Sequence, residues 1–233
     1  MIPNSKFVSQ FPTIALTETD QVLACCAVAR EKLETGDYEA GCAVLQPWWN
    51  IGEWPRHEGL ENTASAELLL IAGTLSGWVA SSKQTIGGRK PAEALLNGSI
   101  ALFEQLGNRA KAAEGRIELA CCYYHQGVFD LARWTLQIAL KDVPSQQKEL
   151  RSVALLRMAV VDRLAGRLHD ALALLDEANP LLEHADAWPK GRFHLECANT
   201  LKDLGLAEGK KLYLERAIEH YEEARWQFTA IGN

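Results

Sequence analysis

Apolar residues recur at intervals of three and four along most of the chain, which is the period of an amphipathic α-helix. The clearest stretch, 112–144, predicts one helix that ends near Gly127 and a second that starts at Phe129. The stretch 152–179 repeats this arrangement, with Gly166 in the place of Gly127. Val, Ile and Thr form no alternating runs, so the pattern predicts an all-α protein without strands.

The amino-acid composition also favours helices, and the net charge bears on which kinds of partner the protein can bind. Leu and Ala, both strong helix formers, contribute 33 and 32 of the 233 residues. The formal net charge is −6, and the 24 Lys and Arg form no basic cluster of the kind that follows a phosphate backbone. We therefore expect no nucleic-acid partner.

The cysteines and the N-terminal residues indicate the cellular compartment in which the protein lies. The six Cys lack the CxxC spacing of metal ligands, and two adjacent pairs lie in apolar helical stretches, where Cys acts as a small buried hydrophobe. This usage suits a reducing cytoplasm. The first residues show no signal peptide, and the longest uncharged stretch, 68–82, is shorter than a span of about 20 residues. We expect a cytoplasmic protein without a membrane partner.

Small residues mark a repeat. In each predicted pair a Gly can end the first helix because it adopts positive φ without a side-chain clash, and a small residue shortly afterwards lets the two backbones approach closely. These small residues recur at intervals of roughly 40 to 50 residues, and they are Gly41, Ala92, Ala132, Ala171 and Ala217.

These units resemble tetratricopeptide repeats (TPR). The unit at 113–140 fits the family's pattern of small and aromatic positions, whereas in the unit at 152–179 Asp162 replaces an aromatic residue. The resemblance implies a right-handed α-solenoid of about five TPR-like helix-turn-helix pairs over residues 19–233, after an N-terminal lead at 1–18. Units near 40 residues are similar to the longer repeats of bacterial signalling and regulatory proteins. The matching residues are Ala120, Tyr123, Gly127, Phe129, Ala132 and Ala139 in the first unit, and Ala159, Gly166, Leu168, Ala171 and Ala178 in the second.

The three other units are more diverged from the pattern. In the first, Pro47 is expected to end the second helix early, since proline lacks the backbone N–H and clashes with the preceding turn. In the last, we expect the first helix to end at Gly205 and the segment 205–213 to form an insertion between the helices.

The Trp residues divide into two groups. Trp134 and Trp226 lie among apolar spacings and are expected in the core or between repeats. Trp48, Trp49 and Trp54 flank two prolines in a non-helical link, where they either cover the start of the array or form an exposed aromatic patch. The cover is the favoured interpretation.

The residues carry no catalytic constellation. Cys121 and His125 lie one helical turn apart, but nothing in the sequence orients the histidine or supplies an oxyanion hole, so structural packing is favoured. His194 and Glu196 lie about 200° apart around a helix and cannot chelate one ion. We expect no enzyme, no cofactor and no metal site.

The family resemblance implies a binding groove lined by the first helix of each pair. The Lys-Asn-Asn set that clamps a C-terminal carboxylate in chaperone-binding members is absent, so an acidic C-terminal tail is not the expected ligand. The mixed apolar and polar lining suits an amphipathic helix or an extended peptide. The candidate contact residues are Trp78, Tyr124, His125, Arg163, Arg192, Asn199 and Lys202.

Two functions fit this architecture. The first is a protein–protein interaction module, a scaffold or sensor that binds a peptide or partner protein in the groove and can self-associate through its ends. The alternative is the regulatory arm of a larger signalling protein or enzyme whose effector domain lies outside this chain. Gly232-Asn233 resembles Gly107-Asn108, which leads into another helix, so we expect the array to continue beyond residue 233.

Overall fold

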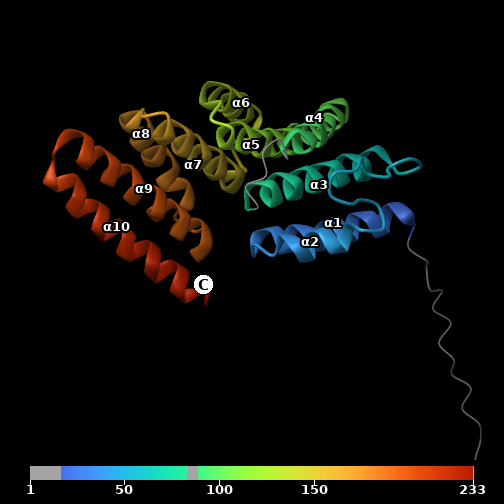
Figure 1. Ribbon diagram of the computed structural model, residues 1–233, viewed down its shortest axis with the longest axis horizontal. Helices are drawn as coiled ribbons and strands as arrows, with labels where there is room; N and C mark the ends of the chain where they lie inside the picture. Colours follow the sequence, from blue (N-terminus) through green and yellow to red (C-terminus); the bar gives the residue numbers. More distant parts are fainter. Residues whose placement is uncertain (1–16, 83–88, 233) are drawn as a thin grey trace, which may run out of the picture.

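The computed structural model describes residues 17–82 and 89–232, and all regular secondary structure within these ranges is helical (Figure 1). Most of the predicted N-terminal lead and Asn233 lie outside the described residues. The helices of the described part are α1 (Glu18–Glu34), α2 (Tyr38–Leu45), α3 (Asn62–Ser82), α4 (Arg89–Gln105), α5 (Arg109–His125), α6 (Phe129–Asp142), α7 (Lys148–Leu164), α8 (Leu168–Ala178), a short 3₁₀ helix (Asn179–Leu182), α9 (Ala187–Glu208) and α10 (Lys211–Ala230).

The predicted turns of the two clearest units are confirmed. Gly127 and Gly166 each have a φ of 78°, and the next helix begins two residues later in both cases. A side chain with a Cβ is strained in this left-handed conformation, so glycine is the residue that allows so short a turn. The same geometry occurs at Gly36 between α1 and α2.

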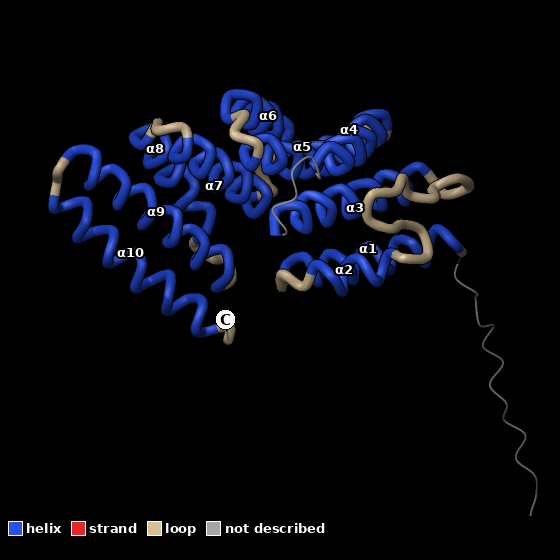
Figure 2. The backbone as a smooth tube through the Cα atoms, viewed as in Figure 1, coloured by secondary structure: helices blue, strands red, loops and turns tan. Residues whose placement is uncertain are grey.

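The described helices form two layers that follow an arc (Figures 1 and 2). Each odd-numbered helix contacts the next odd-numbered one, from α1 to α9, whereas the even-numbered helices do not touch one another. Each even helix up to α8 packs instead against the odd helices before and after it. The odd helices therefore form the inner layer of the arc, and α1–α2 and α9–α10 lie at its two ends.

Small residues allow the two layers to approach. Ala92, Ala132 and Ala171 are fully buried, and Gly41 and Ala217 are also buried, as their role as small contacts predicts. A Cβ on Gly41 would lie 2.9 Å from Cδ2 of Leu75. The close approach of these helices thus depends on the absence of larger side chains.

The prediction for the last pair was wrong. Helix α9 passes through Gly205 and ends at Glu208, and Gly209, with a φ of 65°, makes the turn into α10. Gly205 is a packing residue, because a Cβ there would lie 2.7 Å from Cδ2 of Leu214. The sequence has glycine at both positions, and the true turn is the second one.

The prediction for Trp134 and Trp226 was also wrong, because the two residues are 59% and 63% exposed. Each follows a buried alanine, Ala132 or Ala224, by two positions. Two positions correspond to about 200° around a helix, so both indoles lie on the face opposite the buried stripe.

The tryptophans after α2 largely cover the first helix pair. Helix α2 ends at Leu45, as Pro47 predicts, and Trp48 and Trp49 then turn into the core. Trp54 remains 53% exposed, and its Nε1 donates a hydrogen bond to Nε2 of His57 at 3.1 Å. The cover is therefore confirmed for two of the three residues.

Helix α3 is a core helix of unusual apolarity. Among the described helices it is the one whose length and mean hydropathy of 1.3 would allow a membrane span. However, 72% of that apolar window is buried inside the protein, and the helix packs mainly against α4 and α1. Its composition is accounted for by these neighbours.

Candidate functional site

The inner layer carries a groove of about 360 Å³ to which every odd-numbered helix contributes. Its wall includes Arg30 from α1, Glu118 from α5 and Arg157 from α7. Aromatic rings complete it, because Tyr38 stacks on Trp78 with ring centroids 5.9 Å apart and Trp188 lies at the α9 side. The groove therefore combines flat apolar surfaces with charged groups, as ligand sites commonly do.

Arg157 is the cation of this groove that is available to a ligand. Its guanidinium carbon lies 5.2 Å from the centroid of the Trp78 ring, within the range of a cation–π contact. Within the described part of the chain this guanidinium makes neither a hydrogen bond nor a close ion pair, and its charge acts on Glu118 and Glu196 only at longer range. Since arginine remains protonated in proteins, its N–H donors face the groove as a fixed positive charge.

The neighbouring cations are already engaged. Arg30 forms ion pairs with Glu67 and Glu114, and Nζ of Lys111 lies 3.0 Å from Glu67 and 3.1 Å from Glu114. This network joins α1, α3 and α5 and neutralises that end of the groove. Nη2 of Arg192, on the α9 side of the groove, lies 3.5 Å from Glu196, so Arg157 is the groove arginine that has no ion pair with a described residue.

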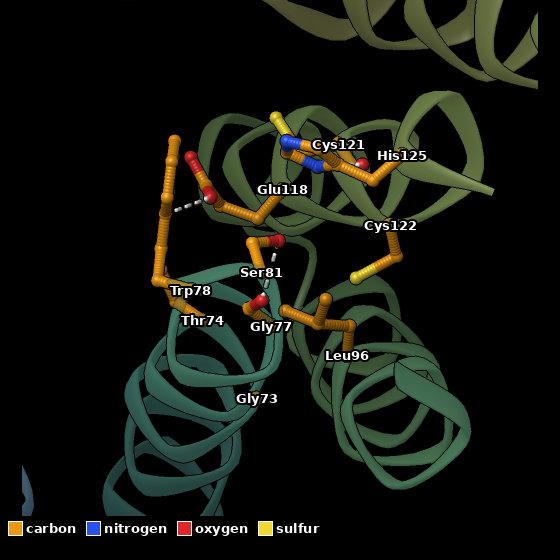
Figure 3. Close-up of a pocket in the computed structure, with 10 residues that line it drawn as sticks. All are labelled: Gly73, Thr74, Gly77, Trp78, Ser81, Leu96, Glu118, Cys121, Cys122 and His125. Carbon is orange, nitrogen blue, oxygen red and sulfur yellow. Dashed lines mark hydrogen bonds between the residues drawn. The ribbon is translucent and has the colours of Figure 1, made fainter. Parts of the chain in front are cut away.

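Glu118 balances Arg157 from the opposite side. Its Oε2 accepts a hydrogen bond from Nε1 of Trp78 at 3.3 Å (Figure 3). Burial raises the pKa of Glu118, while the charge of Arg157 and the hydrogen bond from Trp78 act in the opposite direction. Trp78 thus touches both partners, stacking under the cation and donating to the carboxylate.

Behind Trp78 the side chains leave almost no free space. The crevice drawn in Figure 3 has a volume of about 10 Å³, close to the minimum for one water molecule. Nδ1 of His125 lies 2.7 Å from the backbone oxygen of Cys121, and the His125 ring meets Trp78 edge to face at 6.1 Å. These residues pack against one another and support the groove wall.

Cys121 has the chemistry of a packing residue. Burial raises the pKa of its thiol to about 12. A nucleophilic cysteine needs the opposite shift, because the thiolate is the reactive form. The i, i+4 relation between Cys121 and His125 is a backbone contact of the helix, as the packing interpretation anticipates.

The structure places the predicted contact residues in two groups. Trp78 and Arg192 line the groove, and His125 and Tyr124 adjoin it, with 4.1 Å between their ring centroids. The other residues lie toward the C-terminal ends of α7 and α9.

This second group is occupied by internal contacts. Arg163 Nη1 lies 3.2 Å from Asp203, and Nζ of Lys202 lies 3.4 Å from the same carboxylate. The amide oxygen of Asn199 accepts a hydrogen bond from Tyr221 of α10 at 2.7 Å. Asn199 thus connects α9 to its own partner helix.

Sequence reasoning missed Arg157 and Trp188. The repeat pattern assigns the neighbours Leu156 and Val160 to the groove and passes over Arg157 between them. The sequence did contain a signal for Arg157, because it is a charged residue inside an otherwise apolar helical segment. Its stacking partner, Trp78, could not be found in this way because the two residues are 79 positions apart.

No three His, Cys, Asp or Glu side chains of the described residues gather closely enough to hold a metal ion. The groove offers one guanidinium stacked on an indole, a half-buried carboxylate and aromatic walls. No model of a known protein family matches the sequence, and no curated protein matches it either.

Proposed function

We propose that the arc of helix pairs is a right-handed α-solenoid of TPR-like repeats. The support is the two-layer arrangement, in which every inner helix contacts its inner neighbours and the outer helices are kept apart. The positive-φ glycines at the turns and the buried small residues at the helix contacts agree with this repeat. Such an array presents its inner helices as one concave surface.

We propose further that this protein is an interaction module that binds an extended peptide segment in the groove of the inner layer. Arg157 carries the argument, because its guanidinium donors are unused and face the groove, where the oxygen atoms of a ligand can accept hydrogen bonds from them. The aromatic walls formed by Tyr38, Trp78 and Trp188 offer apolar contact beside it. A peptide with an acidic side chain among apolar residues matches both features.

A peptide display experiment on the full chain tests this proposal. We expect a random library to be enriched in peptides that carry Asp or Glu next to apolar residues. Arg157→Glu should weaken their binding at least tenfold, since loss of a charge-assisted hydrogen bond costs about 1.5 to 3 kcal/mol. The matched control Arg225→Glu, on the exposed surface of α10, should leave binding unchanged.

Two outcomes would contradict the proposal. One is the absence of any enriched peptide. The other is a set of peptides that bind Arg157→Glu as tightly as the unmodified chain, which would place their binding site on another surface.

A further inference from the structure

A second hollow, between α7 and α9, contains a buried carboxylate. Its volume is about 130 Å³. Val153, Leu156 and Val160 of α7 form one wall, and Trp188 forms part of the other. Glu196 of α9 also lines this hollow, although its side chain is only 9% exposed.

The Glu196 carboxylate lacks hydrogen-bond donors. Its Oε2 is buried without a partner, and within the described residues neither oxygen accepts a hydrogen bond. The nearest cations are Nη2 of Arg163, 3.6 Å from Oε2, and Nη2 of Arg192, 3.5 Å from Oε1. These distances give electrostatic attraction but exceed the length of a good N–H···O bond. Oε2 has almost no accessible surface, so a ligand in the hollow would reach the carboxylate through Oε1, beside Arg192, which also lines the hollow.

The volume and the lining of the hollow determine the size and the kind of group that it can hold. An apolar cavity of about 150 Å³ accommodates a benzene molecule, so about 130 Å³ suits a single ring that remains partly exposed at the mouth. An indole exceeds this space. The aliphatic side chains of α7 and the Trp188 ring offer the contacts that an aromatic ring prefers.

The charges around Glu196 determine which kind of hydrogen-bond donor a ligand can bring to this carboxylate. Two guanidinium groups already approach Glu196, and Arg157 lies at the rim of the same hollow. A lysine or arginine from a ligand would add a further cation beside them, and like charges repel at this range. A neutral O–H donor on an aromatic ring avoids this repulsion.

We propose that this hollow binds the phenol side chain of a tyrosine in the partner peptide. The ring packs between Val153, Leu156 and Trp188, and the phenol O–H donates a hydrogen bond to the Glu196 carboxylate. The proposal rests on the peptide-binding function above and adds a specific residue type to it. The acidic side chain at Arg157 and the tyrosine at Glu196 would then lie on the same peptide, because Arg157, Trp188 and Arg192 border both cavities.

Small probes test the hollow without a known peptide. p-Cresol reproduces the tyrosine side chain, and toluene is the same ring and methyl group without the hydroxyl. Methyl-labelled protein is titrated with each probe while the NMR signals of Val153, Leu156 and Val160 are followed. We expect p-cresol to shift these signals and to bind about tenfold more tightly than toluene, as expected for a hydrogen bond to a charged acceptor. 4-Methylanisole, which keeps the oxygen but lacks the donor, should bind no more tightly than toluene.

Variants locate the effect on the protein. Glu196→Met should abolish the preference for p-cresol, and Val153→Phe should obstruct both probes from the mouth of the hollow. Glu183→Gln, an exposed glutamate, is the matched control and should retain the preference. If Glu196→Met does not fold, the probe comparison on the unmodified chain still decides the question.

Equal affinity for p-cresol and toluene, or shifts confined to methyl groups elsewhere, would overturn the proposal. Peptides captured in an Arg157-dependent way but without any enrichment of tyrosine would also overturn it while leaving the interaction function intact. Loss of peptide capture with p-cresol still bound would instead contradict the interaction function and retain the phenol site.

Discussion

The carboxylate of Asp162 is fully buried between two arginines. Nε of Arg167 lies 2.8 Å from it and Nε of Arg133 lies 2.9 Å away, so the group connects α6, α7 and the start of α8. The repeat pattern has an aromatic ring at this position. A charged cluster therefore joins the third and fourth helix pairs where the pattern has apolar contact.

Asp162→Ala should lower the free energy of unfolding by about 1 to 3 kcal/mol, because it removes the buried acceptor and leaves the inward-facing N–H donors of Arg133 and Arg167 unpaired. Urea unfolding followed by circular dichroism measures this change. Asp170→Ala is the control, since this carboxylate is 56% exposed and lies 3.6 Å from Arg133. Its loss should cost less than about 1 kcal/mol. Similar losses for the two variants would show that the buried cluster does not stabilise the junction.

At the scale of helix pairs, α9 and α10 form the most extensive helix contact of the described chain. Gly205 permits the close approach near the turn, and the Phe228 ring packs over Gly191 near the other end. Between them, Nδ1 of His194 and Nδ1 of His220 lie 2.9 Å apart. Two close glycine contacts and one contact between histidine rings therefore characterise this helix pair.

Gly205→Ala should destabilise the protein by about 1 to 3 kcal/mol, the usual cost of overpacking. The new Cβ would meet both the side chain and the backbone nitrogen of Leu214, the latter at 3.2 Å, so a rotamer change of Leu214 would still leave a tight backbone contact. Gly98→Ala in α4 is the control because its Cβ would make ordinary contacts, the nearest at 3.4 Å. Thermal unfolding should show a lower Tm for Gly205→Ala and an equal or higher Tm for Gly98→Ala, since alanine favours helix. A Tm for Gly205→Ala at or above that of the unmodified chain would contradict the predicted clash.

Acid should weaken the α9–α10 pair. Burial lowers the pKa of His194 and His220 below the ordinary 6.5, and the two rings disfavour a second proton between them, although Glu223 partly opposes the shift. The unfolded chain therefore binds more protons than the folded one, so this contribution to stability is complete above pH 6.5 and is lost as the pH falls. Urea unfolding between pH 8 and pH 5 measures this loss.

His220→Gln is the matched variant for this effect. It removes one of the two coupled rings, and the difference in stability between the variant and the unmodified chain should therefore change over the acidic range. A difference that stays constant from pH 8 to pH 5 would contradict a role for the histidine pair.

At the scale of the whole molecule, predictability follows the range of the interactions involved. The helix pairs at 109–142 and 148–178 were predictable because a glycine turn and a buried small residue act within about 40 residues of sequence. The contact between Trp78 and Arg157 was not, because it depends on how α3, α5 and α7 stack. The error at Gly205 has a similar origin, since a turn glycine and a packing glycine look alike until the partner Leu214 is placed.

Because each helix contacts only its neighbours, different parts of the molecule should unfold separately. Helix α10 packs only against α9 in the described part of the chain, whereas α5 contacts α3, α4, α6 and α7. In a structure held together by neighbouring pairs, the ends can unfold while the centre stays intact. Hydrogen–deuterium exchange followed by mass spectrometry should therefore show faster exchange in α10 than in α5. Gly205→Ala should accelerate exchange in α9 and α10 while leaving α1 to α4 unchanged, because no helix of that first group touches the altered pair. An equal acceleration throughout the chain would mean that the pairs unfold together, and the local account of stability would then be wrong.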